Sequence, residues 1–276
     1  MNFNINTDSV LRILIKIIIV LCIVCLILFA VFLLCRSCAP ENTVANETET
    51  DFETQSTPVQ NVILNTVNEY DADYIEKIIF LGESTTAHMR SRGVLPGGTN
   101  TTQVWSDASN TMTLDINTAS KKIVYPDTGV EMTIAEAVAK KKPEYMVLTF
   151  GLNGVTGFYS NKNLYVTSYE RLIEAIRQNS PETKIIIQSI FPVSSLDLQS
   201  NWAYSSSPEV INGYLDTLNE WAIEVAQKCN VKYIDTASLL KDSQGYLKSG
   251  YQTDGIHLTA EAYKIILNYI GTHKYM

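Results

Sequence analysis

The sequence predicts an α/β fold with a central parallel sheet, preceded by one transmembrane helix. Two patterns support this prediction: apolar runs of strand length alternate with amphipathic segments in the C-terminal two thirds, and one long apolar stretch lies near the N-terminus. Such alternation is typical of a parallel sheet with helices on both faces. We expect strands over 77–81, 145–150, 184–190 and 231–234, and helices over 134–142, 168–178, 208–228 and 260–270. One further strand is expected at 103–104, 112–116 or 123–125.

The N-terminal stretch predicts a signal-anchor. Residues 17–34 are 18 consecutive apolar residues, close to the roughly 20 that cross the core of a bilayer. Arg12 and Lys16 precede the run and Arg36 follows it closely, so the positive-inside rule places the N-terminus in the cytoplasm. A cleaved secretory signal is the alternative, because residues 37–39 loosely fit a small-residue cleavage site. We favour the anchor because the run is longer than the apolar part of most such signals.

The chain is therefore expected to have four parts. These are a short cytoplasmic N-terminus over 1–16, a transmembrane helix over 17–35, a flexible acidic linker over 36–70 and a catalytic domain over 71–276 outside the membrane. The linker is rich in Thr, Asn, Glu and Ser, which is typical of a solvated tether.

Composition narrows the classes of partner and cofactor. The chain has 21 basic and 29 acidic residues and a net charge of −8, which disfavours binding to nucleic acid. Cys229 is the one cysteine of the expected domain, so we expect no disulfide within it. The sequence has no P-loop, dinucleotide fingerprint or zinc-binding motif, and we expect no cofactor and no metal.

Two short motifs follow expected strands. Gly82-Glu83-Ser84 comes directly after the strand at 77–81, and Gly151-Leu152-Asn153 comes after the strand at 145–150. Ligands of an open parallel sheet bind at the carboxyl ends of its strands. We therefore expect Ser84 and Asn153 to face one cleft.

A third motif places an acid beside a histidine. Asp254-Gly255-Ile256-His257 lies just ahead of the last expected helix and contains one of only three histidines. A serine hydroxyl needs a base to remove its proton, and the base needs a group that fixes its tautomer. His257 is the candidate base for Ser84, and Asp254 is the candidate acid. His88, four residues after Ser84, is the rival base.

The same chemistry needs donors for the oxyanion that forms during attack on an ester. The backbone N–H of Ser84 and the side-chain amide of Asn153 are the two expected donors of the oxyanion hole. Asn153 has a second interpretation as a turn residue, since asparagine and glycine suit positive φ.

The ordered set of motifs resembles the SGNH (GDSL-type) serine hydrolase family, whose serine, glycine, asparagine and histidine stand in four separate blocks. Three of the four blocks are recognisable between Ile78 and Met276. The resemblance implies a flavodoxin-like three-layer α/β/α sandwich, the SGNH hydrolase fold. It also implies cofactor-free esterase chemistry, with Asp254 as the acid and His257 as the base.

The sequence departs from the family pattern in three places. Glu83 stands where the family usually has aspartate, and Gly154 replaces the aspartate that usually follows the asparagine. No glycine occurs between Gly98 and Gly129, where the family's oxyanion-hole glycine would be sought. The third donor is expected within 105–110 without an assignment.

These observations predict a membrane-anchored extracytoplasmic serine esterase that removes small acyl groups, such as acetyl, from cell-wall or other carbohydrate through an acyl-enzyme. The expected partners are an acylated carbohydrate or another small ester, and the membrane through the N-terminal helix. Two alternatives stay open: an acyltransferase on the same scaffold, and a non-catalytic cell-wall binding module.

Overall fold

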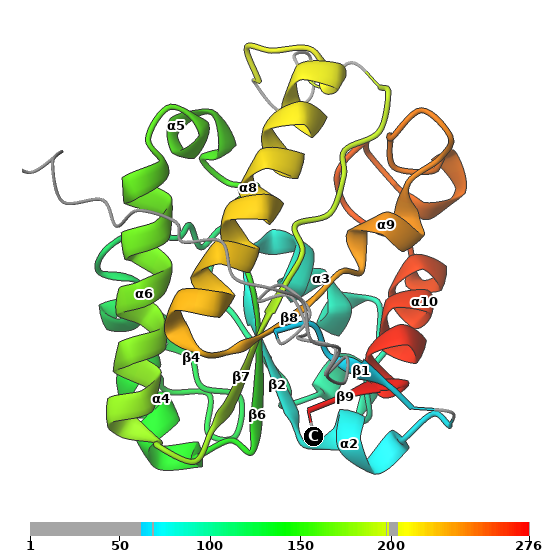
Figure 1. Ribbon diagram of the computed structural model, residues 1–276. Helices are drawn as coiled ribbons and strands as arrows, with labels where there is room; N and C mark the ends of the chain where they lie inside the picture. Colours follow the sequence, from blue (N-terminus) through cyan, green and yellow to red (C-terminus); the bar gives the residue numbers. More distant parts are fainter. Residues whose placement is uncertain (1–61, 68, 197, 199–203, 276) are drawn as a thin grey trace, which may run out of the picture. The chain divides into compact units, whose positions relative to one another are not determined.

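The computed structural model describes residues 62–67, 69–196, 198 and 204–275 (Figure 1). At its centre lies a parallel sheet of five strands in the order β3-β2-β6-β7-β8. The strands are β2 (Ile78–Gly82), β3 (Val104–Trp105), β6 (Tyr145–Thr149), β7 (Lys184–Gln188) and β8 (Lys232–Ile234). In chain order this is the 2-1-3-4-5 arrangement of flavodoxin-like sheets, which confirms the predicted fold class.

The register of the two central strands sets the position of the site. β2 pairs with β6 from Ile78 opposite Tyr145 to Gly82 opposite Thr149, so both strands end at the same level. The strand order reverses between β2 and β6, and ligands of such folds bind beyond the carboxyl ends of the strands at this point. The segments that follow Gly82 and Thr149 therefore leave the sheet side by side at the edge where such folds bind ligands.

Helices cover both faces of the sheet (Figure 1). One face carries α4 (Ile134–Lys141), α6 (Lys162–Asn179) and α8 (Pro208–Cys229), and the other carries α2 (Ala72–Glu76), α3 (Ser84–Ser91), α9 (Ala237–Leu240) and α10 (Ala260–Gly271). Successive strand residues point to opposite faces. Ile79 and Leu81 accordingly pack in the first core, and Ile78 and Phe80 pack in the second. Burial on both faces explains why the strands are continuous apolar runs.

Side-chain caps fix the starts of the long helices. Ser207 accepts a hydrogen bond from the N–H of Val210 at the start of α8, and Thr259 accepts one from Ala262 at the start of α10. Both caps agree with the helix starts predicted from the sequence. α6 begins six residues earlier than expected, because Asn161 caps it by accepting from the N–H of Leu164 at 3.1 Å.

The region between β2 and α4 holds one strand of the main sheet and a separate two-stranded hairpin. β3 corresponds to the first of the three predicted alternatives. β4 (Lys122–Val124) pairs antiparallel with β5 (Glu131–Thr133), and corresponds to the third. Residues 112–116, the second alternative, form no strand.

The domain starts earlier than the predicted boundary at residue 71. Val62 and Leu64 are buried, and the N–H of Leu64 donates to the carbonyl of Tyr233 at 3.2 Å. β1 (Asn65–Thr66) then pairs antiparallel with β9 (His273–Lys274). The linker predicted over 36–70 therefore extends too far at its C-terminal end, where apolar residues add a short segment to the edge of the sheet.

The transmembrane helix predicted over 17–35 lies outside the described residues, as do the cytoplasmic segment 1–16 and the linker as far as residue 61. Within the part of the chain that the structure describes, no helix is both long enough and apolar enough to cross a membrane.

Candidate active site

Ser84 is the first residue of α3, two positions beyond the end of β2. The close packing of this turn requires glycine at position 82, because a Cβ atom there would overlap the hydroxyl of Thr86 and the carbonyl of Thr149. The N–H groups of the first helical turn have no acceptor within their helix. The turn thus presents a half-buried hydroxyl next to backbone donors.

The structure brings the candidate base and acid to this serine. The Nε2 atom of His257 lies 3.0 Å from Oγ of Ser84, across 173 positions of sequence. On the other side of the ring, Nδ1 of His257 lies 2.8 Å from Oδ2 of Asp254. An ionised carboxylate only accepts hydrogen bonds, so Nδ1 carries the hydrogen and the lone pair of Nε2 faces the serine. This is the arrangement in which an imidazole can take a proton from a hydroxyl.

The carboxylate of Asp254 is fixed by its own loop. Oδ1 accepts from the backbone N–H groups of Ile256 at 3.1 Å and His257 at 2.8 Å. Burial acts to raise the pKa of Asp254, but the hydrogen bonds from His257 and Ile256 outweigh it and hold the pKa below its ordinary value. The acid therefore stays ionised beside a ring that is itself buried.

A second set of contacts closes the loop over 252–258. The guanidinium of Arg92, at the end of α3, donates to the carbonyl of Leu258 at 3.2 Å and to the hydroxyl of Thr253 at 3.4 Å. Gly255 adopts φ +96°, a conformation that favours glycine, and its N–H donates to the side chain of Gln252 at 2.7 Å. Sequence reasoning missed Arg92, because only the fold brings the end of α3 to this loop.

Glu83 has a larger structural role than its place beside the nucleophile suggested. Its carboxylate is buried and accepts three backbone N–H groups, from Gly151 at 3.0 Å, Leu152 at 3.0 Å and Asn153 at 3.1 Å. Burial raises the pKa of Glu83 to about 8, while the three N–H donors act in the opposite direction. One side chain thus fixes the segment that follows β6 to the segment that follows β2.

The hydrogen bonds to Glu83 hold Asn153 beside the segment that carries Ser84. Its amide nitrogen donates to the carbonyl of Met112 at 3.1 Å and lies 3.4 Å from that of Thr111. Gly154, which replaces an expected aspartate, has φ +84° and caps the start of α5 (Val155–Tyr159). The glycine therefore suits the turn, and the amide of Asn153 is held between two loops.

The segment that follows β3 makes its turn without a glycine. Asn110 adopts φ +57°, in the left-handed region that asparagine tolerates better than most residues. Asp107 supports the turn by accepting from the N–H groups of Thr111 at 2.9 Å and Met112 at 3.1 Å. The N–H of Asn110 donates to the carbonyl of Asp107. This N–H thus has an acceptor within the turn, and the third oxyanion donor predicted within 105–110 stays unassigned.

Among the described residues, His88, the rival base, makes no hydrogen bond to Ser84. Its ring instead stacks on the ring of His257, with centroids 4.1 Å apart and planes 29° from parallel. Burial lowers the pKa of His88, and the nearby charges of His257 and Arg92 lower it further. The structure therefore places His88 beside the base and not in its place.

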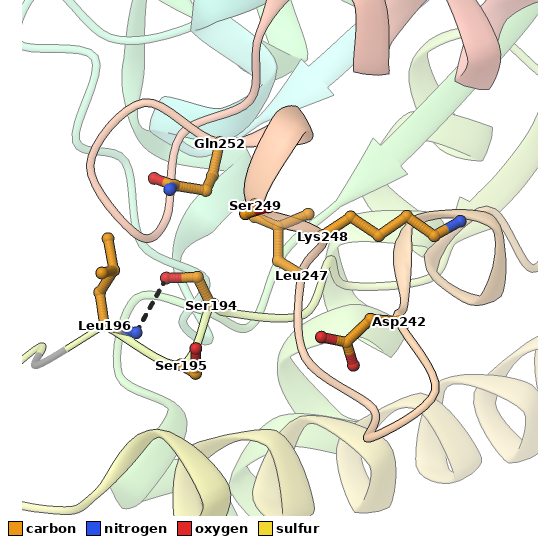
Figure 2. A pocket seen from close by; sticks show the side chains of 8 residues that line it. All are labelled: Ser194, Ser195, Leu196, Asp242, Leu247, Lys248, Ser249 and Gln252. Carbon is orange, nitrogen blue, oxygen red and sulfur yellow. Dashed lines mark hydrogen bonds between the residues drawn. The ribbon is translucent and has the colours of Figure 1, made fainter.

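A hollow lies next to Gln252, at the start of the loop over 252–258 (Figure 2). Its volume is about 220 Å³, and it is lined by Ser194, Ser195, Leu196, Asp242, Leu247, Lys248, Ser249 and Gln252. The N–H of Ser194 donates to the carbonyl of Gly255 at 2.8 Å. The hollow thus shares its wall with the loop that holds Asp254. In the described part of the chain, no group of three or more His, Cys, Asp or Glu residues has an arrangement that could hold a metal ion.

Known proteins resemble the chain in sequence pattern and in fold. The sequence model of the GDSL-like Lipase/Acylhydrolase family matches residues 80–265. No curated protein matches the chain significantly in sequence.

Three solved structures illustrate the likeness in fold. A candidate platelet activating factor from Streptococcus pneumonia is 20% identical over 69% of this chain and 79% of that chain, with a TM-score of 0.47. A GDSL-like lipase from Bacteroides thetaiotaomicron is 14% identical over 70% of this chain and 85% of that chain, with a TM-score of 0.42. An acetylxylan esterase from Geobacillus stearothermophilus, solved as a catalytic mutant, is 15% identical over 72% of this chain and 96% of that chain, with a TM-score of 0.39.

Proposed function

The chain belongs to the GDSL-like lipase/acylhydrolase family, and from this premise we propose that it removes small acyl groups from carbohydrate through an acyl-enzyme on Ser84. Membership of the family makes the chain a serine hydrolase that acts on esters. The observation that carries the proposal is the pair of contacts from Ser84 to His257 and from His257 to Asp254, at 3.0 and 2.8 Å.

In the first half of the reaction, Nε2 of His257 takes the proton of the Ser84 hydroxyl while Oγ attacks the carbonyl carbon of the ester. The carbonyl oxygen becomes an oxyanion, and the new imidazolium donates its proton to the departing alkoxide as the ester bond breaks. Asp254 stabilises the imidazolium and keeps the hydrogen on Nδ1.

In the second half, His257 takes a proton from water, and the resulting hydroxide attacks the acyl-enzyme carbonyl. The bond to Oγ then breaks, and the imidazolium returns a proton to Ser84. The product is a free carboxylic acid. The same intermediate gives acyl transfer when a sugar hydroxyl takes the place of water.

The oxyanion needs donors that are in place before the reaction starts. The backbone N–H of Ser84 and the amide of Asn153 are the proposed donors. Two features favour this assignment: Ser84 lies in the first turn of α3, and Asn153 is held by the segment that Glu83 fixes. To reach the oxyanion, the Asn153 amide exchanges its hydrogen bond to the carbonyl of Met112 for one to the substrate.

The lining of the hollow in Figure 2 supports a polar carrier for the acyl group. Hydroxyl, amide, ammonium and carboxylate groups share its wall with two leucines, beside the loop that carries Asp254, and such polar groups suit the hydroxyls of a sugar. The net charge of −8 disfavours nucleic acid and anionic lipid headgroups as substrates.

The test compares the full-length protein with Ser84→Ala on p-nitrophenyl acetate, p-nitrophenyl octanoate and an acetylated xylan or peptidoglycan. We expect hydrolysis of the acetyl esters by the wild type alone, and labelling of Ser84 by a fluorophosphonate that disappears in His257→Ala. Equal turnover by Ser84→Ala would refute the acyl-enzyme. A preference for the octanoate would refute the small acyl group, and acetylated sugar products in place of acetate would identify a transferase.

We further propose that a helix over residues 17–35 anchors the protein in the cell membrane, with the N-terminus in the cytoplasm and the domain outside. The support is the 18-residue apolar run and the basic residues that precede it. Protease added to intact cells should digest the domain and leave a cytoplasmic tag at the N-terminus protected. Release of the domain without detergent would contradict the anchor and favour cleavage.

A further inference from the structure

One helix carries the candidate nucleophile and a ring that contacts the candidate base. His88 lies one turn after Ser84 on α3, and its ring faces that of His257 at a centroid distance of 4.1 Å. Asp254 contacts the same imidazole in its plane, at Nδ1. The imidazole of His257 is therefore held at an edge by a carboxylate and on a face by a second imidazole.

The polar atoms of His88 contribute little to this packing. Its Nδ1 is buried and has no hydrogen-bond partner among the described residues. A buried polar atom without a protein partner costs free energy, so a histidine retained at this position calls for an explanation. His88 contacts His257 through its flat face, which an aliphatic side chain of similar size would lack.

We propose that His88 is a positioning residue, whose ring holds the imidazole of His257 in the plane that points Nε2 at Ser84. The inference rests on the proposed function, since it takes His257 as the base. The hydrogen bond to Asp254 fixes the position of Nδ1 in the ring of His257. Contact with the face of the His88 ring opposes rotation of that imidazole, which would move Nε2 away from Oγ of Ser84.

The charges around His88 suit this role. Arg92 lies on the same helix, and Asp254 and His257 face His88 from the loop over 252–258. Burial lowers the pKa of His88, the neighbouring His257 and Arg92 lower it further, and Asp254 acts in the opposite direction. A neutral ring can support an imidazolium as it forms, because aromatic faces attract cations, whereas a protonated His88 would repel it.

Two variants of similar size separate the flat ring from mere volume. In the full-length protein, we expect His88→Leu to lower kcat for p-nitrophenyl acetate about 10- to 100-fold with KM unchanged, as small misalignments of reacting groups do. His88→Phe restores a flat face and should recover most of the lost kcat. The downfield proton resonance of Nδ1–H between His257 and Asp254 should persist in His88→Phe and broaden in His88→Leu.

His273 supplies a matched control. It is a buried histidine that stacks on Tyr269 at 3.8 Å, and it lies in β9, outside the site. His273→Leu should lower the free energy of unfolding and leave kcat unchanged. This control separates the loss of a stacked histidine in general from its loss beside the base.

Wild-type kcat in His88→Leu, or equal losses in His88→Leu and His88→Phe, would overturn the positioning role. If His88→Leu does not fold, His88→Met takes its place with the same expected outcome. Failure of the proposed function gives a different result, because the wild type would then match Ser84→Ala before any substitution at position 88.

Discussion

The two loops that flank Ser84 are held in different ways. The loop over 252–258 closes mainly on itself, since Asp254 accepts from backbone N–H groups two and three residues further on. The segment Gly151–Asn153 depends on Glu83, which lies 68 to 70 residues earlier in the chain. Damage to the first loop should therefore affect chemistry more than folding. Damage to the second should affect both.

The difference follows from what each loop must do. The first carries a base that must keep one tautomer, which a neighbouring carboxylate can ensure locally. The second must hold the side-chain amide of Asn153 away from β6. The buried side chain of Glu83, which follows the adjacent strand β2, provides that support. Five substitutions or conditions test this contrast.

The largest expected effect is that of Asp254→Asn. The amide can keep the backbone hydrogen bonds of the loop but can also donate to Nδ1, so the imidazole takes the wrong tautomer. We expect kcat to fall on the order of 10⁴-fold, as in other serine hydrolases with this change. Steady-state hydrolysis of p-nitrophenyl acetate measures the loss, and circular dichroism should show a folded protein. Near-normal kcat would remove Asp254 from the mechanism.

Asn153→Ala comes next, because it removes one of the two proposed donors to the oxyanion. We expect kcat to fall about 10²- to 10³-fold with little change in KM. Asn161→Ala is the matched control, since that asparagine caps α6 outside the site. A rise in KM without a fall in kcat would make Asn153 a substrate-binding or turn residue.

Glu83→Gln tests the remote support directly. The substitution replaces a buried acceptor of three N–H groups by an amide with one oxygen and two hydrogens of its own. We expect the free energy of unfolding in urea to fall by about 2 kcal/mol. We also expect kcat to fall about tenfold through displacement of Asn153. Loss of stability without loss of kcat would show that the segment keeps its position without the carboxylate.

Asn110→Ala tests the turn that follows β3, which is held by local contacts, as is the loop over 252–258. Alanine in the left-handed region costs about 1 kcal/mol, whereas Asn110→Gly should be close to neutral. Thermal unfolding of the two variants gives the comparison. Equal destabilisation would show that the bond between the side chains of Ser106 and Asn110 matters more than backbone conformation.

The smallest effect concerns pH. The pKa of Asp254 is lowered in the folded protein, so its ionised form contributes stability above the ordinary pKa of 3.8. This contribution is lost as pH falls below 3.8 through the lower folded value. The difference in unfolding free energy between wild type and Asp254→Asn should therefore shrink in this window. A constant difference would mean that the lowered pKa has no effect on stability.

The sequence predicts the parts of the molecule that depend on local pattern. The strands are apolar runs buried on both faces, and Ser207 and Thr259 cap helices that begin where expected. Asp254 and His257 are three residues apart, so their contact could be inferred from spacing alone.

Other features depend on contacts that spacing does not reveal. The bonds from Glu83 to the segment after β6, and the stacking of His88 on His257, become visible only once the fold brings distant residues together. The positive φ of Asn110 carries a weak sequence signal, since asparagine is common in that conformation but far from specific to it. The packing of Val62 and Leu64 against the domain was missed because the apolar stretch there is too short to stand out from the polar residues around it.

The placement of three residues on α3 has a consequence for thermal motion. Ser84, His88 and Arg92 lie at the first turn, the second turn and the end of one helix, and the last two contact the base or its loop. When that helix shifts by a fraction of an ångström, the hydroxyl and the contacts on its proton acceptor shift in the same direction. The gap between Oγ of Ser84 and Nε2 of His257 should then fluctuate less than it would if the two residues were supported by separate elements.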